Sequence, residues 1–297
     1  MLTTGKIEKL DYKNLIWFYS SHMQAAIKYL MKSMNLILIA FLMITLNISM
    51  FFQSLALAQD SAEGVVKKDE GVPWDKPTDV AIDPSGDVYV TGFSYSNATG
   101  YDYVTIKYDA NGNELWIRRY NNGAGDYAFA LTLDSSDNVY VTGFSYSNST
   151  GYDYVTIKYD TDGNELWVNR YNYGDNDRAV DINVDPSGNI YVAGFSYSNS
   201  TGYDCVTIKY DTDGNELWVN RYDHGDNDRV VSLAVDSSGN VYVTGFSYSN
   251  STGYSYVTVK YDTYGDELLV NSYDSGENDR ADDLGVASSD NICIGNM

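Results

Sequence analysis

Few side chains that could do chemistry occur only once in this sequence. After the apolar N-terminal segment, the chain has a single histidine, His224, and two cysteines, Cys205 and Cys293. Catalysis by a nucleophile and a base needs an asymmetric set of groups, and a zinc site needs several nitrogen or sulfur ligands close together. His224 has no such neighbour in the sequence, and the cysteines fall in different repeat units. We therefore expect no catalytic residue, no metal centre and two unpaired thiols.

The carboxylates are far more numerous, with 41 acidic against 19 basic residues and a net charge of −22. We expect Asp177 and Arg178 of the segment GDNDR, and likewise Asp228 and Arg229, to brace neighbouring repeat units by hydrogen bonds. The alternative for this segment is a Ca²⁺ site. The segment DTDGNE (Asp160–Glu165) resembles the start of an EF-hand loop, but its glycine comes at the fourth position, not the sixth. An Asp-Gly hairpin explains it without metal. No cofactor is expected, although clustered surface acids leave weak Ca²⁺ binding open.

A Tyr- and Ser-rich segment, YSNSTGY or a close variant, is the best candidate for a binding surface. Tyrosine gives a large contact area at low entropic cost, while Ser, Asn and Gly form adaptable hydrogen bonds. The alternative is that these tyrosines pack between repeat units. The candidate ligand-binding residues are Tyr95, Tyr101, Tyr146, Tyr152, Tyr197, Tyr203, Tyr248 and Tyr254. The same segments contain Asn-x-Ser/Thr glycosylation sequons at Asn97, Asn148, Asn199 and Asn250.

These segments recur because the chain is a tandem repeat with a period of 51 residues, marked by Phe93, Phe144, Phe195 and Phe246. Complete units run over about 76–126, 127–177, 178–228 and 229–279, and 280–297 begins a fifth. Residues 63–75 align with the end of a preceding unit. A period of this length is typical of solenoids, propellers and arrays.

The content of one unit favours a propeller. In the third unit, four runs rich in Val, Ile, Tyr and Thr are separated by turn residues: 181–185, 189–196, 205–211 and 216–222. We expect the segment 197–204 to form a longer loop. Four short antiparallel strands per unit form a β-propeller blade, whose faces are buried by stacking against the neighbouring blades. The fold class is therefore all-β, a β-propeller built from 51-residue four-stranded blades.

The pattern D-x-S-G-N-V-Y-V-T-G-x-S, followed by G-Y-D-Y-V-T-I-K-Y-D and G-N-E-L-W, resembles the SBBP-type β-propeller repeat of exported microbial proteins. The resemblance covers about Glu63 to Asn296. It implies a ring of about seven blades, whereas this chain has four complete units and partial units at both ends. A truncated or open propeller is therefore as consistent with the sequence as a complete small one.

The N-terminus has the features of an export signal. Lysines precede the apolar run Asn35–Phe52, and Ala56-Leu57-Ala58 has the form of a signal-peptidase site, so cleavage would leave Gln59 first. We expect residues 1–58 to be a lead and signal peptide and 59–297 to be the repeat domain. The alternative is an uncleaved signal anchor. Either reading places the repeats outside the cytoplasm, secreted or at the cell surface, with the membrane contacted only through this segment.

These observations predict an exported, non-catalytic scaffold that binds extracellular carbohydrate or protein through its repeated loops. A strongly negative surface repels phosphate backbones, which argues against nucleic acid as a partner. Propellers also host lyases, glycosidases and quinoprotein dehydrogenases, so the domain of an extracellular enzyme is the alternative. A truncated fragment without independent function is the third reading.

Overall fold

The computed structural model describes residues 75–123, 125–224, 227–249, 253–274, 279, 283–286 and 292–295. All of them belong to one compact unit, residues 65–297, which is distinct from residues 1–64. The expected signal peptide therefore lies outside the described residues. Within those residues, no helix is long and apolar enough to cross a membrane.

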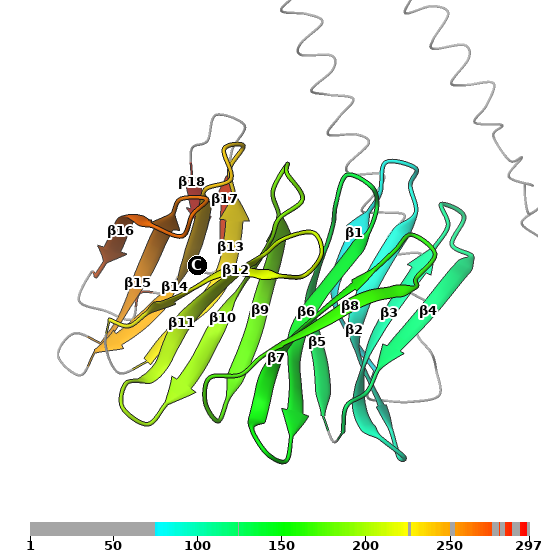
Figure 1. Ribbon diagram of the computed structural model, residues 1–297, viewed down its shortest axis with the longest axis horizontal. Coiled ribbons are helices and arrows are strands. Elements are labelled where there is room, and N and C mark those ends of the chain that lie inside the picture. Colours follow the sequence, from blue (N-terminus) through cyan, green and yellow to red (C-terminus); the bar gives the residue numbers. More distant parts are fainter. Residues whose placement is uncertain are drawn as a thin grey trace, which may run out of the picture. The chain divides into compact units, whose positions relative to one another are not determined.

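The described chain is all-β, as predicted, and each complete repeat unit forms four consecutive antiparallel strands (Figure 1). In the first unit they are β1 (Lys76–Ile82), β2 (Val88–Ser96), β3 (Gly100–Tyr108) and β4 (Glu114–Tyr120). In the second they are β5 (Asp126–Leu133), β6 (Val139–Ser147), β7 (Gly151–Tyr159) and β8 (Glu165–Tyr171). Each unit is a simple meander, since the order of the strands in the sheet is their order in the sequence.

The third and fourth units repeat this arrangement. Their strands are β9 (Asp177–Val184), β10 (Ile190–Ser198), β11 (Gly202–Tyr210), β12 (Glu216–Tyr222), β13 (Asn227–Val235), β14 (Val241–Ser249), β15 (Gly253–Tyr261) and β16 (Glu267–Tyr273). The fifth unit contributes β17 (Asp283–Val286) and β18 (Ile292–Gly295). A single parallel pair, Tyr203 with Asn227, connects β11 to β13 and so joins the third sheet to the fourth.

The turn after the first strand of each unit, which we call the inner strand, explains the D-x-S-G-N motif. In the third unit, one carboxylate oxygen of Asp185 accepts hydrogen bonds from the backbone N–H groups of Ser187 and Asn189. The other oxygen accepts from the Asn189 amide and the Tyr191 hydroxyl. Gly188 has a φ of 85°, a conformation that glycine adopts without strain. The aspartate accepts the same turn hydrogen bond in all four units, as Asp83, Asp134, Asp185 and Asp236, although the second unit has Asp137, with a φ of 60°, in place of the glycine. The position of this aspartate is thus a requirement of turn geometry.

Neighbouring sheets pack face to face through three apolar clusters. The first cluster joins Tyr89 and Trp116 of the first unit to Val141 and Ile157 of the second, and equivalent residues form the second and third clusters. Each outer-strand tryptophan also donates its indole N–H to a carbonyl of the next unit, as Trp116 does to Thr161. Burial of such faces between units is the main source of stability in repeat proteins.

The outer face of the first sheet lacks this cover, and that of the fourth sheet has it only in part, where Leu284 of β17 packs against Ala234 and Tyr242. Val80 is 48% exposed, whereas Leu131 at the same position of the second unit is 6% exposed. Leu269 is 46% exposed, whereas Trp116 at its position in the first unit is 8% exposed. Within the described residues no strand pairing joins β17 or β18 to β1. Ring closure and the number of blades stay predictions.

Cys205 leaves a gap between the third and fourth sheets. The equivalent residues Tyr103 and Tyr154 are fully buried, and their hydroxyl groups donate to backbone carbonyls of the next sheet. The shorter Cys205 side chain instead lines a small cavity together with Tyr222 and Val257. Cys205 is not in a disulfide, as predicted, while the side chain of Cys293 lies outside the described residues.

We expect Cys205→Tyr to stabilise the chain by about 1–2 kcal/mol, because it fills the cavity and places a hydroxyl group near the Val257 carbonyl. Urea unfolding should show a higher midpoint with an unchanged slope. Cys205→Ala is the matched control and should lower the midpoint. A lower midpoint for the tyrosine variant would mean that the sheets cannot accept the ring.

Candidate functional site

The candidate binding surface lies where the second and third strands of each unit turn back. The three described hairpins, β2–β3, β6–β7 and β10–β11, are at the same end of their sheets (Figure 1). We call this end, with the eight candidate tyrosines, the hairpin rim. The predicted loop 197–204 is largely wrong, because β10 and β11 extend to Ser198 and Gly202 and leave only three residues unpaired. Cross-strand pairing of the tyrosines extends the ladder into that segment.

The eight tyrosines form four cross-strand pairs. In each pair the ring centroids are 5.0–5.2 Å apart, in edge-on or tilted geometry that favours aromatic contact. The pairs are Tyr95–Tyr101, Tyr146–Tyr152, Tyr197–Tyr203 and Tyr248–Tyr254. Tyr95 is exposed and the other seven are half-buried. Each pair therefore presents part of its aromatic surface at the rim while the remainder packs against the protein.

The second tyrosine of each pair also contacts the next unit. The Arg178 guanidinium lies 5.0 Å from the centroid of the Tyr152 ring and 4.9 Å from that of Phe144. Arg229 makes the equivalent contacts with Tyr203 and Phe195. Arg178 thus braces adjacent units, as expected, but by stacking on aromatic rings and not by hydrogen bonds. A cation over an aromatic face is favourable by about 0.5–2 kcal/mol.

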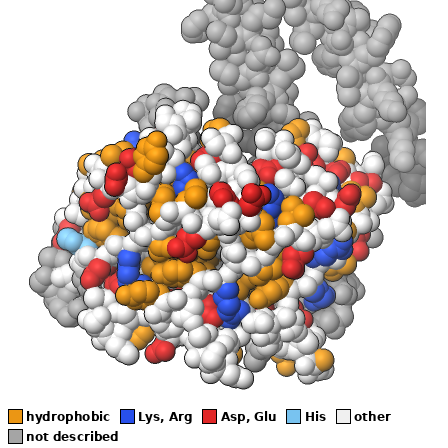
Figure 2. Space-filling model, viewed as in Figure 1, with side chains coloured by type: hydrophobic (Ala, Val, Ile, Leu, Met, Phe, Trp, Pro, Cys, Tyr) orange, Lys and Arg blue, Asp and Glu red, His pale blue; other side chains and the backbone are white. Residues whose placement is uncertain are grey.

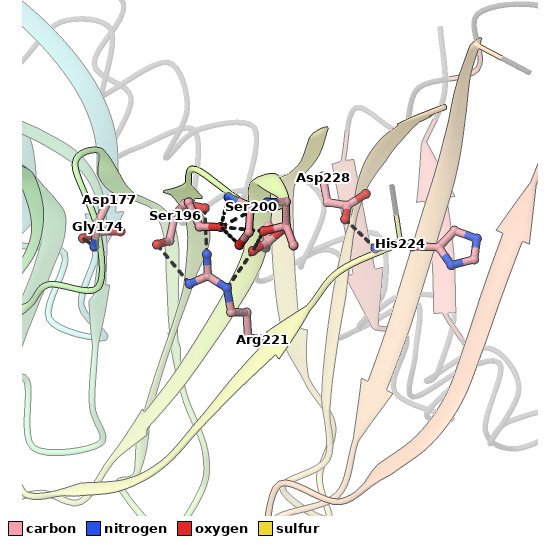
Figure 3. A network of polar contacts seen from close by, with 10 residues as sticks. Gly174, Asp177, Ser196, Ser200, Arg221, His224 and Asp228 are labelled. Atoms are coloured by element: carbon pink, nitrogen blue, oxygen red, sulfur yellow. Dashed lines mark hydrogen bonds and ion pairs between the residues drawn. The ribbon is translucent and has the colours of Figure 1, made fainter. Parts of the chain in front are cut away.

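Behind the tyrosines, a polar network holds the hairpins of the second and third units. In the third unit the Thr201 hydroxyl donates to Asp204 at 2.8 Å, and Arg221 pairs with the same carboxylate oxygen at 2.7 Å. Arg221 also donates to the hydroxyl and the backbone carbonyl of Ser196 (Figure 3). The hairpin backbone is therefore fixed by hydrogen bonds to buried groups, which makes the rim a pre-organised surface.

This network accounts for the spacing of the sequons. The threonine two residues after Asn97, Asn148 or Asn199 donates its hydroxyl to the buried aspartate of its own hairpin. The three asparagines are exposed, and Asn250 lies outside the described residues. Glycosylation at these positions stays a prediction, because a structural role of the threonine explains the Asn-x-Thr pattern by itself.

A second set of aspartates lies at the rim, and two of them, Asp177 and Asp228, belong to the GDNDR segments that were expected to brace neighbouring units. Asp126 and Asp177 begin the inner strands of the second and third sheets, Asp228 is the second residue of β13 in the fourth sheet, and all three are fully buried. Each lies beside the hairpin aspartate of the preceding unit, which is Asp102, Asp153 or Asp204, and burial raises the pKa of all three inner-strand acids. We call these the junction acid pairs. The sequence placed Asp177 and Asp228 at the junctions, whereas their pairing with the hairpin aspartates was not predicted.

Comparison with known proteins agrees with this architecture. Residues 223–255, from the outer end of the third unit through the hairpin of the fourth, match the sequence profile of the β-propeller repeat SBBP. These residues carry the SBBP repeat. The resemblance stated from the repeat pattern is therefore confirmed.

Two curated proteins share sequence with the SBBP units. The uncharacterized WD repeat-containing protein L264 of Acanthamoeba polyphaga mimivirus is 25% identical over 169 residues, which cover 57% of this chain and 10% of that protein. Regulatory protein FlaEY of Caulobacter vibrioides is 30% identical over 167 residues, which cover 46% of this chain and 17% of that protein. The chain thus matches a small part of each relative.

Solved structures also resemble the SBBP units. A fucose lectin from Kordia zhangzhouensis in complex with methyl-fucoside covers 49% of this chain and 99% of its own, with 17% identity and a TM-score of 0.32. Sqt1 from Chaetomium thermophilum covers 74% of this chain and 66% of its own, with 12% identity and a TM-score of 0.41.

His224 is exposed, and its ring stacks on Tyr222 with 5.9 Å between the centroids. Its backbone N–H donates to Asp228 at 2.7 Å (Figure 3). Burial raises the pKa of the Cys205 thiol well above its usual value, which disfavours the nucleophilic thiolate. The described contacts therefore do not activate His224 as a base or Cys205 as a nucleophile.

The inner strands β1 and β9 carry two further carboxylates that interact electrostatically, Asp79 and Asp181. Asp79 accepts a hydrogen bond from the Leu131 N–H, and Asp181 accepts from the Leu233 N–H and the Ser232 hydroxyl. Burial, reinforced by the charge of Asp79, raises the pKa of Asp181 to about 6. The protonated form of Asp181 is therefore favoured in the folded state relative to the unfolded chain.

We expect this group to lower stability as the pH rises from about 4 to 7. Between its ordinary pKa of 3.8 and about 6, the folded chain binds more protons at Asp181 than the unfolded chain does. The free energy of unfolding should therefore fall with rising pH, by about 3 kcal/mol from this group. Asp181→Asn should flatten the profile measured by urea unfolding from pH 4 to 8. An unchanged slope would contradict the assignment.

Proposed function

We propose that this chain is an exported, non-catalytic scaffold that binds carbohydrate or protein through its hairpin rim. The observation that carries the proposal is the repetition of one half-exposed tyrosine pair, on one pre-organised hairpin, at the same end of successive sheets. Flat aromatic surfaces flanked by Ser and Asn hydrogen-bonding groups suit both sugar rings and protein side chains. Repetition converts weak single contacts into avidity.

The remainder of the surface supports this choice of site. On the face shown in Figure 2, apolar side chains form separate patches interrupted by acidic and basic groups. The exposed leucines Leu166, Leu217 and Leu268 belong to outer strands and lie away from the hairpins. The net charge of −22 disfavours a polyanionic partner such as nucleic acid.

The test is binding of the purified chain to glycan and extracellular-matrix protein arrays. A fourfold variant with Tyr95, Tyr146, Tyr197 and Tyr248 changed to Ser should lose at least about tenfold in apparent affinity, because all four contacts contribute to avidity. Tyr264→Ser is the matched control, since Tyr264 is exposed in the β15–β16 turn at the opposite end of its sheet. Equal binding by both variants, or no binding by the wild type, would overturn the proposal.

A further inference from the structure

We propose that the junction between the third and fourth sheets binds Ca²⁺ through Asp204, Asp223 and Asp228. These residues come from three separate segments: β11, the connection after β12, and the start of β13. One carboxylate oxygen of each lies within 4.8 Å of the other two. This spacing allows one cation to contact all three oxygens. The inference does not depend on the hairpin rim binding a partner.

The second observation is a set of buried oxygens that lack hydrogen-bond donors. The Oδ2 atom of Asp204 is used by Arg221 and Thr201, and that of Asp228 by the His224 N–H. The Oδ1 atom of each residue is buried without a hydrogen-bond partner, and both side chains are about 99% buried, since each residue is 1% exposed. Leaving a charged oxygen buried and unpaired costs several kcal/mol. These two oxygens are therefore available as ligands.

The same arrangement recurs at the other two junctions. Among the described residues, seven buried side-chain polar atoms lack a partner, and six of them are the Oδ1 atoms of the junction acid pairs. They belong to Asp102, Asp126, Asp153, Asp177, Asp204 and Asp228. A feature repeated at each junction is a property of the repeat. The third junction differs because Asp223 stands where the earlier units have Asn121 and Asn172.

The charge balance of the third junction favours a divalent ion. Two buried carboxylates, Asp204 and Asp228, lie beside one cation, Arg221, and Asp223 adds a third carboxylate at the surface. The available ligand atoms are all oxygens, the donors that Ca²⁺ and Mg²⁺ prefer. Ca²⁺ accepts irregular geometry and carbonyl ligands, whereas Mg²⁺ needs a near-ideal octahedron. Asp223 is exposed and provides the route by which the ion enters.

Binding would connect two sheets that otherwise share one strand-pairing contact at this end, Tyr203 with Asn227. A cation bound by residues of β11 and β13 would hold the third and fourth hairpins in a fixed relative position. We therefore expect the chain to be more resistant to heat with Ca²⁺ than with a chelator. At a Ca²⁺ concentration 100 times the Kd, the melting temperature should rise by roughly 5 °C or more.

The experiment uses the full chain, stripped with EDTA and dialysed. Calorimetric titration with CaCl₂ should give a saturable site, and Tb³⁺ should show luminescence sensitised by nearby tyrosine such as Tyr222, which shares the junction cavity with Asp228. Asp223→Asn should weaken Ca²⁺ binding about tenfold, because affinity follows the charge count of the ligands. The matched control is Asp213→Asn, which removes the same charge from an exposed turn.

Asp228→Asn should abolish Ca²⁺ binding at this site. Because this variant changes a buried residue and could also disturb folding, Asp223→Asn is the variant that decides between the outcomes. Retained Ca²⁺ affinity in Asp213→Asn with a tenfold loss in Asp223→Asn supports the site. No saturable binding, or equal losses in both variants, would overturn it and would indicate that the acid pair holds a proton. An equal melting shift with MgCl₂ would overturn the assignment to Ca²⁺.

Discussion

Gly194→Ala is expected to destabilise the chain by at least about 3 kcal/mol, enough to unfold a large fraction of a marginally stable protein. The inner strand β9 has a bulge opposite Gly194, where the pairing register shifts between Ala193 and Gly194. A Cβ atom on Gly194 would come closer than 3.0 Å to the Arg178 carbonyl oxygen, the Ala179 Cα and the Tyr154 hydroxyl. Two of these atoms are backbone and cannot move without breaking the ladder.

Gly239→Ala separates this effect from a general cost of replacing glycine. Gly239 has a φ of 80°, but the atom nearest to its added Cβ, Thr263 Oγ1, lies at 3.5 Å. Backbone strain alone should therefore cost about 1 kcal/mol. Chemical denaturation of both variants measures the difference. Similar losses in the free energy of unfolding at the two positions would mean that the bulge in β9 can relax around the added methyl group. The glycine at the position of Gly194 would then reflect only a preference of the local backbone.

Much of the fold could be predicted from sequence because the repeat multiplies weak local signals. The alternation in segments such as Asp181–Asp185, together with Gly188 in its turn, places strands and turns in one unit, and the 51-residue period extends them to the others. The boundaries were less accurate at the rim, where Tyr197 and Tyr203 are strand residues. Tyr and Ser occur in both loops and strands, so composition could not show that these rings pair across the hairpin.

The site could be predicted only in part, for a different reason. Sequence analysis found the tyrosines of the rim, since their type indicates a contact surface. It placed Asp177 and Asp228 at the junctions between units but did not pair them with the hairpin aspartates, because Asp204 and Asp228 belong to different units that meet at one parallel pair, Tyr203 with Asn227. The stacking of Arg178 on Phe144 and Tyr152 likewise depends on the packing of neighbouring units. Distances between units are set by packing, which the period does not specify.

Arg170→Met should lower the free energy of unfolding by about 3 kcal/mol. Asp153 is 1% exposed, and Arg170 provides its ion pair while also donating to the hydroxyl and the carbonyl of Ser145. Methionine keeps most of the apolar volume but removes the charge, so the Asp153 carboxylate would be left buried without its cation.

The fourth unit supplies the control for this variant. It has Ser255 and Ser272 where the second unit has Asp153 and Arg170, so the chain already contains a unit from which both charges have been removed together. The double variant Asp153→Ser with Arg170→Ser should therefore recover most of the stability lost by Arg170→Met, to within about 1 kcal/mol of the wild type. Urea unfolding in EDTA, which removes any cation at the junctions, measures all three chains. If the double variant is as unstable as Arg170→Met, the cost arises from the lost contacts of Arg170 with Ser145 and not from an uncompensated carboxylate.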